Sequence, residues 1–272
     1  MNKSAYIGLK NIFVDDGVFD YINLDKSSAV YEKLVQAIDK PLKLILFFGR
    51  PGTGKTFLLQ KIYNDFKKKR NIIFFPRPFF NELEFLKALY TETFKEEAPS
   101  ISGYDQFLSI VTKKLDLSKK DKAITVLIDE SQLYPDELIE KIRLMADSRK
   151  FKFLFTVHKT DEEDVLAKDY FATRIWETIE LESSSSHEVK TYIEKKLIFH
   201  NKFEYLNLFK EKHFKLIMQF TKGNLRNINK LLFKLFEILE YYDISSPSKI
   251  NPRSLNTKFL IMAGISQGMV NV

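Results

Sequence analysis

The sequence predicts an α/β fold in which a parallel β-sheet lies between layers of helices, followed by a smaller helical domain. Two apolar runs, 42–48 and 123–128, have the length and composition of buried strands. Amphipathic stretches with helical spacing separate these runs from further short apolar runs. Because strands that alternate with helices form a parallel sheet, we predict an αβα sandwich, with an N-terminal lead-in, for residues 1–182. The serine-rich stretch 183–186 marks the boundary to a helical domain at 183–272.

The expected elements follow one another in a regular order. Residues 1–28 are expected to form a turn-rich lead-in, and Lys40-Pro41 ends the helix that follows it, because the residue before a proline disfavours helical geometry. Strands are expected at 42–48, 71–75, 123–128, 151–157 and 175–181. Helices are expected at 29–38, after residue 56, from Asn81 through 122 with a break at 99–103, at 136–147, and repeatedly after His187.

A glycine-rich segment at 49–56 directly follows the first strand. It reads Gly-Arg-Pro-Gly-Thr-Gly-Lys-Thr, which is a complete G-x-x-x-x-G-K-T phosphate-binding loop, or P-loop. Glycines let successive N–H groups turn toward a phosphate, and the following helix adds the partial positive charge of its N-terminus. Lys55 is expected to reach the β- and γ-phosphates, and the Thr56 hydroxyl to ligate Mg²⁺. The predicted phosphate-binding residues are Gly49, Arg50, Pro51, Gly52, Thr53, Gly54, Lys55, Thr56 and Phe57.

A second motif stands where the run 123–128 ends, at Asp129 and Glu130. A buried strand that ends in two carboxylates has the pattern of a Walker B element. Asp129 is predicted to hold Mg²⁺ directly or through its water shell, and Glu130 to orient and polarise the attacking water. Two solvated acids at a strand end would give the same pattern, but the complete P-loop upstream favours the functional interpretation.

The strand 151–157 is followed by His158. A polar residue at this strand tip would lie near the γ-phosphate of a bound nucleotide, where it could position water. His158 and Thr156 are both candidates for this role, and we include His158 among the predicted catalytic residues. The alternative is a histidine that is exposed or held by a structural hydrogen bond, and the sequence leaves this choice open.

Composition excludes several classes of protein. The chain has 272 residues, of which 44% are hydrophobic, so it can bury the cores of one large and one smaller domain. It contains no cysteine, which excludes disulfides and thiolate metal sites. We find no pattern of a secretory signal or membrane span and expect a cytoplasmic protein. The net charge of +7 would suit a polyanionic partner, but the basic run 67–70 is interpreted as a solvated helix end.

The combination and order of these motifs resemble the AAA+ ATPases, and within them the ExeA/MshM group associated with type II secretion and type IV pilus systems. The stretch Ile128-Asp129-Glu130-Ser131-Gln132 resembles the I-D-E-A-Q box of that group, and 139–145 resembles the L-E-x-x-R-L-L helix that follows it. The stretch 223–229 resembles the G-x-P-R-x-I-N lid motif, and Asp20-Tyr21-Ile22 the N-terminal segment. The similarity covers nearly the whole chain, although many ATPases share the P-loop and the D-E box.

This resemblance implies an AAA+ fold with sheet order 5-1-4-3-2, a helical lid at 183–272, and Mg²⁺-dependent hydrolysis of ATP to ADP. It implies that Arg226 is a sensor 2 residue for the γ-phosphate of its own subunit. It also implies that Arg174 is an arginine finger for a neighbouring subunit, so a homo-oligomer is expected in the ATP state. The implied partner is a protein of an inner-membrane assembly for secretion, pilus formation or DNA uptake. Nucleic acid is a less favoured partner.

The chain departs from the pattern of that group at two places. Val157-His158-Lys159-Thr160-Asp161 stands where G-Q-P-E-L is usual, and Leu225 replaces the proline before Arg226. The first departure motivates one alternative function, a nucleotide-dependent switch or scaffold that binds ATP and hardly hydrolyses it. Another alternative is a DNA-associated AAA+ ATPase that assists transposition or replication, since such proteins share this core.

Overall fold

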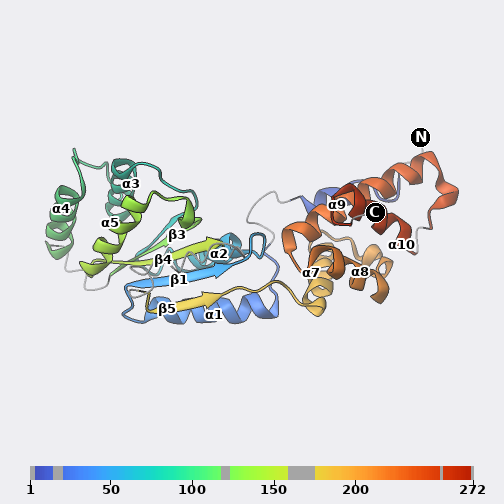
Figure 1. Ribbon diagram of the computed structural model, residues 1–272, viewed down its shortest axis with the longest axis horizontal. Helices are drawn as coiled ribbons and strands as arrows, with labels where there is room; N and C mark the ends of the chain where they lie inside the picture. The colour runs from blue at the N-terminus through green and yellow to red at the C-terminus, as the bar shows by residue number, and fades with distance from the viewer. Residues whose placement is uncertain (1–3, 15–20, 118–122, 159–174, 252–253, 271–272) are drawn as a thin grey trace. The chain divides into compact units, whose positions relative to one another are not determined.

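The strands of the computed structural model form one parallel sheet in the order β2-β3-β4-β1-β5 (Figure 1). The structure describes residues 4–14, 21–117, 123–158, 175–251 and 254–270. Every neighbouring pair of strands is parallel. The predicted α/β fold and the sheet order 5-1-4-3-2 are therefore confirmed. The strands are β1 (Leu44–Gly49), β2 (Ile72–Phe75), β3 (Ile124–Ile128), β4 (Phe151–His158) and β5 (Glu177–Glu180).

The helices fall into those that surround the sheet and those that follow it. None of the helices in the described ranges has the length and hydropathy of a membrane span. The first group comprises α1 (Asp25–Asp39), α2 (Lys55–Phe66), α3 (Glu82–Phe94), α4 (Tyr104–Leu117) and α5 (Asp136–Asp147). The second comprises α7 (Ser186–Phe199), α8 (Glu211–Thr221), α9 (Leu225–Ser245) and α10 (Thr257–Ser266). Short 3-10 helices are η1 (Leu9–Phe13), η3 (Ser131–Leu133), η5 (Phe203–Leu208) and η6 (Pro247–Lys249).

Helices cover both faces of the sheet, which explains why its central strands read as continuous apolar runs. All five residues of β3 are buried, and so are the first seven of β4. On one face the side chains of Phe153 and Phe155 pack in a core with α3, α4 and α5, while α1 lies on the opposite side of the sheet (Figure 1). A sheet buried on both faces leaves the ends of its strands as the places where polar side chains can gather.

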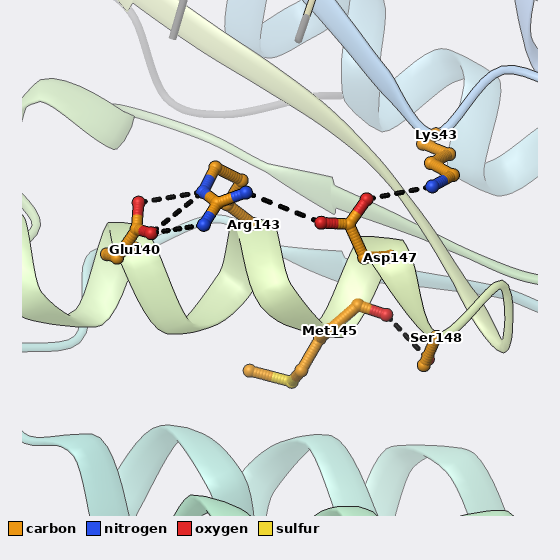
Figure 2. Close-up of polar contacts among 6 residues, drawn as sticks. All are labelled: Lys43, Glu140, Arg143, Met145, Asp147 and Ser148. Atoms are coloured by element: carbon orange, nitrogen blue, oxygen red, sulfur yellow. Dashed lines mark hydrogen bonds and ion pairs between the residues drawn. The ribbon is translucent and has the colours of Figure 1, made fainter. Parts of the chain in front are cut away.

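A polar network fastens α5 to the chain that enters β1. Arg143 Nε donates to both carboxylate oxygens of Glu140, at 2.9 and 2.8 Å, and Nη1 donates to Asp147 at 3.3 Å (Figure 2). Lys43 Nζ donates to the other oxygen of Asp147 at 2.8 Å. Because Lys43 directly precedes β1, this network lies at the edge of the sheet opposite the P-loop. It helps to fix the position of α5 against the sheet.

Internal contacts divide the chain into two compact units. The sheet unit comprises Ala29–Arg50 and Lys55–Leu181, and the helical unit comprises Met1–Ser28, Pro51–Gly54 and Glu182–Val272.

The N-terminal segment belongs to the core of the helical unit. Its apolar side chains Tyr6, Leu9, Ile12 and Phe13 are buried there, and Phe13 stacks on Phe236 of α9 with ring centroids 5.6 Å apart. The sequence pattern suggested a lead-in to the α/β domain. The packing differs because the apolar face of η1 is covered by α9.

Candidate nucleotide site

The P-loop joins the end of β1 to the start of α2. Gly49 is the last residue of β1 and pairs with His158 at the end of β4. Gly52 and Gly54 have φ angles of 80° and 102°, which residues with a Cβ rarely adopt. The backbone therefore requires glycine at these two positions, whereas Gly49, in strand β1, does not have a positive φ. Lys55, the first residue of α2, is buried at 5% exposure, whereas Thr56 is exposed.

The side chain of Lys55 turns back onto the loop that precedes it. Lys55 Nζ donates to the carbonyl oxygen of Gly49 at 2.8 Å and to that of Arg50 at 3.2 Å. A buried ammonium requires such acceptors, because burial of a charge without partners is costly. An ionised phosphate oxygen would be a stronger acceptor than a carbonyl. The amine is thus already held over the loop whose N–H groups would bind the phosphates.

The Walker B residues are positioned by Thr156. Asp129 is 2% exposed, and its Oδ1 accepts hydrogen bonds from the Thr156 hydroxyl and from the backbone N–H of Glu130 at 3.1 Å. Thr156 Oγ1 also accepts from Glu130 N at 3.0 Å, and Ser131 Oγ donates to Thr156 O at 2.7 Å. The hydroxyl of Thr156 is therefore used in two hydrogen bonds at the turn after β3, one to Asp129 and one from the backbone of Glu130. Of the two candidates at this strand tip, His158 is the one with an exposed fraction, 25% of its side chain.

The carboxylate of Glu130 is held by two side-chain donors. Its Oε1 lies 3.0 Å from His158 Nε2, and its Oε2 accepts from Gln132 Nε2 at 2.5 Å. Burial and the positive charge of Lys55 lower the pKa of His158, against the opposing effect of Glu130. The imidazole is therefore neutral near pH 7 and donates its Nε2–H to the carboxylate. Both oxygens of Glu130 keep further lone pairs that can accept a proton or a hydrogen bond.

The sequence analysis assigned no role to Gln132. Its amide must present Nε2 to the Glu130 carboxylate, because the amide oxygen would be repelled. As a result Oε1 points away, and it is buried without a hydrogen-bond partner among the residues that the structure describes. The only sequence signal was its place two residues after Glu130 in the D-E box.

Neither of the two arginines predicted to be catalytic belongs to the described part of the sheet unit. Arg226 lies at the start of α9 in the helical unit, with an exposed side chain, and its backbone N–H is 3.4 Å from Gly52 O of the same unit. Asn224, the N-cap of α9, donates to Pro51 O. A Cβ on Gly52 would lie 2.4 Å from Asn224 Oδ1, so this approach requires glycine. Arg174 lies outside the described residues.

The residues present suit a divalent cation only in combination with a nucleotide. Within the described ranges no three His, Asp or Glu side chains gather closely enough to hold a metal by themselves. Thr56 and Asp129 offer oxygen atoms, which are the ligands that Mg²⁺ prefers, and phosphates and water commonly complete its coordination. The donor set therefore fits a Mg²⁺–nucleotide complex.

The comparisons with known proteins agree with this geometry. Residues 38–166, which contain the P-loop, Asp129, Glu130 and His158, match the family model described as AAA domain. No curated protein matches the sequence significantly.

Several solved structures share the fold. The ORC2 protein of Aeropyrum pernix in ADPNP and ADP complexes is 13% identical, with a TM-score of 0.60 over 96% of this chain and 72% of that one. The ORC1 protein of the same organism in complex with DNA is 13% identical, with a TM-score of 0.58 over 95% and 69%. The RuvB Holliday junction branch migration motor of Thermotoga maritima is 14% identical, with a TM-score of 0.54 over 94% and 73%. The chain therefore carries, in residues 38–166, the sequence signature of an AAA domain on the P-loop α/β fold that the AAA+ proteins ORC and RuvB also have.

Proposed function

We propose that the protein binds ATP with Mg²⁺ and hydrolyses it to ADP and phosphate at the C-terminal edge of the sheet. The observation that carries this proposal is the geometry of Glu130, whose carboxylate is fixed by His158 and Gln132 next to the buried Asp129. His158 in turn pairs with Gly49, the first residue of the P-loop. A fixed carboxylate at this place is suited to act as a general base toward water.

Each residue has a defined part in this reaction. Lys55 and the N–H groups of the P-loop bind the phosphates, and Thr56 and Asp129 would hold the cation. Mg²⁺, when bound, neutralises charge on the phosphates. Glu130 takes the proton of the water whose oxygen bonds to the γ-phosphorus, and the bond to the ADP oxygen breaks. His158 fixes Glu130, and Thr156 fixes the turn that carries both acids.

Two further roles are supported by the sequence resemblance alone. Arg226 would act as sensor 2 on the γ-phosphate of its own subunit, and Arg174 as an arginine finger in the site of a neighbouring copy. Such a finger supplies positive charge where negative charge develops in the transition state. With this role for Arg174, the ATP state is a homo-oligomer.

Hydrolysis in such a protein is coupled to a partner, for which there are two candidates. The resemblance of the motifs favours a protein of a secretion, pilus or DNA-uptake machine. DNA is the second candidate, favoured by the fold: one structure that shares it is a complex with DNA, and another is a Holliday junction motor. The net charge of +7 agrees with a polyanionic partner.

Substitution of the predicted base tests the reaction. We expect Glu130→Gln to leave ATP binding intact and to lower turnover by about 10²-fold or more, since general base catalysis typically contributes that much. Lys55→Ala is expected to abolish ATP binding. Turnover is measured as phosphate release under multiple-turnover conditions, and binding by titration with a fluorescent ATP analogue.

Two results would contradict the proposed reaction. Equal turnover in the wild type and in Glu130→Gln would remove Glu130 from the mechanism. Tight ATP binding with a near-zero rate in the wild type would instead favour the nucleotide-dependent switch.

A further inference from the structure

The distribution of charge in the helical unit is strongly uneven. The stretch 212–236 contains no aspartate or glutamate, although the chain as a whole has 36 acidic residues against 43 basic ones. The same stretch carries six basic residues, Lys212, Lys215, Lys222, Arg226, Lys230 and Lys234. It covers most of α8, the turn after it and more than half of α9. No acidic side chain lies within this stretch, and Glu211 and Glu237 flank it.

On α8 the helical spacing places the basic side chains on the exposed face. On α8, Lys212, Lys215 and Gln219 are spaced three and four residues apart, so they share one face, and all three are exposed. The opposite face buries Phe214 and Ile217 in the core of the helical unit.

The turn and the next helix continue the charged surface. Lys222 is the exposed C-cap of α8, and Lys230 is exposed on α9, whose neighbours Ile228 and Leu231 are buried. A turn of three residues, 222–224, joins the two helices, which pack against each other. We define the basic face as Lys212, Lys215, Lys222 and Lys230 together with Gln219.

Within the described part of the chain, the four lysines of the basic face have no carboxylate partner. Among the residues that the structure describes, none of them lies within 4 Å of an Asp or Glu oxygen, whereas Lys234 pairs with Glu237 at 2.7 Å. In the sheet unit some basic residues, such as Lys43 and Arg70, are paired with Asp147 and Asp39. Others among its described residues, such as the exposed Lys68 and Lys87, also lack a carboxylate partner. An ordinary solvated surface intersperses both signs of charge. The basic face therefore presents a field that an external polyanion would neutralise.

The chemistry of the face favours nucleic acid over a membrane. A helix that binds an anionic membrane surface places large apolar side chains beside its basic ones. Between residues 204 and 240, all of which the structure describes, no large apolar side chain is exposed. The exposed apolar side chains of these helices and their neighbour α10 lie outside that stretch, at Tyr241, Ile244, Ile261 and Ile265. Neutral hydrogen-bonding side chains, Gln219 and Asn227, accompany the lysines instead. Lysines and amides are the groups that contact phosphate and sugar in nucleic-acid complexes.

We propose that the basic face binds the phosphodiester backbone of nucleic acid without reading its sequence. This inference gives the second candidate partner of the proposed function, DNA, a binding surface, and it rests on that proposed function. The binding itself needs neither ATP nor Glu130, so it is tested without nucleotide. A failure of hydrolysis and a failure of this inference are therefore distinguishable.

The test compares two proteins that lose the same charge from different places. One variant combines Lys212→Gln, Lys215→Gln, Lys222→Gln and Lys230→Gln. Its matched control combines Lys67→Gln, Lys68→Gln, Lys69→Gln and Lys87→Gln, which are exposed lysines of the sheet unit and include the basic run after α2. Binding to a fluorescein-labelled duplex DNA of random sequence is followed by anisotropy between about 50 and 200 mM salt.

We expect the wild type and the control to bind the duplex with similar affinity and a steep salt dependence. The basic-face variant is expected to bind about tenfold more weakly or worse at low salt. Its slope of log affinity against log salt should fall by up to about 3 to 4, since each lost phosphate contact removes about 0.9. ATP affinity, measured in parallel, should stay unchanged in both variants.

Several results would overturn the inference. Equal losses in the two variants would show an effect of net charge alone, and absence of salt-dependent binding by the wild type would exclude a phosphodiester site. If the basic-face variant loses binding to phosphatidylcholine–phosphatidylserine vesicles but keeps duplex binding, the face is a membrane surface. Exposed Lys→Gln changes usually have little effect on stability. If the combined variant nevertheless fails to fold, the pairs Lys212/Lys215 and Lys222/Lys230 are tested separately, and each should lose part of the slope.

Discussion

Glu130 is a strained residue that its neighbours hold in place. Its φ and ψ of 54° and 41° are left-handed, a conformation that costs about 1–2 kcal/mol for a residue with a Cβ. Such a residue persists only where the surroundings determine it from several sides. Here Thr156 binds its backbone N–H, and His158 and Gln132 bind its carboxylate. The function proposed for Glu130 therefore depends on these three side chains.

Gln132→Met tests the positioning of Glu130 at the scale of one residue. Methionine has a similar length but no donor, so the carboxylate loses one of its two fixed contacts. We expect kcat to fall by about 10- to 100-fold, because a small misplacement of a catalytic group has effects of this size. KM and ATP affinity should stay within about twofold, since the lost contact is to Glu130.

The matched control for this substitution is Gln106→Met. Gln106 on α4 accepts hydrogen bonds from Ser102, at 2.8 Å from both its N and Oγ, and no role in the site is assigned to it. It should turn over ATP at the wild-type rate. Unchanged kcat in Gln132→Met, or a parallel loss of ATP affinity, would contradict the positioning role of Gln132.

At the scale of an element, the start of α8 depends on a buried histidine. His213 is fully buried, and its Nδ1 accepts from Lys210 N at 3.0 Å. Within the described ranges its Nε2 has no hydrogen-bond partner. Burial lowers the pKa of His213, and the charges of Lys212 and Lys210 act in the same direction. Protonation would remove the acceptor at Nδ1 and add a positive charge near the positive end of the helix dipole.

The helical unit is therefore expected to lose stability in acid. The pKa of His213 in the folded protein lies below its value of 6.5 in an unfolded chain, so the unfolded state binds more protons between the two values. The stabilising contribution of neutral His213 is complete above pH 6.5 and is lost as the pH falls toward the folded pKa. His213→Asn keeps an acceptor for Lys210 N but does not titrate.

Thermal melting at a series of pH values measures this effect. We expect the melting temperature of His213→Asn to fall less than that of the wild type between about pH 7 and pH 5. His187→Asn, at an exposed position on α7, is the control and should follow the wild type. If His213→Asn keeps the full acid sensitivity of the wild type, the loss of stability has another source.

At the scale of the whole molecule, the predicted arginine finger implies that one copy of the chain does not hold a complete site. We expect the specific ATPase activity to rise with protein concentration and Arg174→Ala to lower it by about 10³-fold, the smaller end of the range for such fingers. Activity is measured across protein concentration together with the mass of the assembly in ATP and ADP. Arg149→Ala, an exposed arginine in the turn before β4, is the control. A fully active monomer would remove Arg174 from the mechanism.

The parts of the site that could be predicted are those that local sequence encodes. The P-loop was predicted because Gly52 and Gly54, which are needed at positive φ, stand with Lys55 in one short motif. Asp129 and Glu130 were predicted because they end an apolar strand. Thr156 was predicted as a candidate for positioning water and not as the side chain that holds Asp129, and Gln132 was given no role. Both contacts depend on hydrogen-bond partners that sequence patterns do not specify.

What the sequence determined by itself was the order of strands and helices, the phosphate-binding loop and the acids at the end of β3, since all of these follow from local periodicity and motif spacing. Only the tertiary structure showed that Thr156 holds Asp129 and the backbone of Glu130, and that His158 contacts the Glu130 carboxylate. The β3–β4 register pairs Ile128 with Phe155, which brings Thr156 level with Asp129 and His158 to the carboxylate of Glu130. A shift of one residue would turn these side chains to the other face of the sheet. Packing likewise decided that the N-terminal segment joins the helical unit, because the apolar face of η1 finds its cover only in the folded chain.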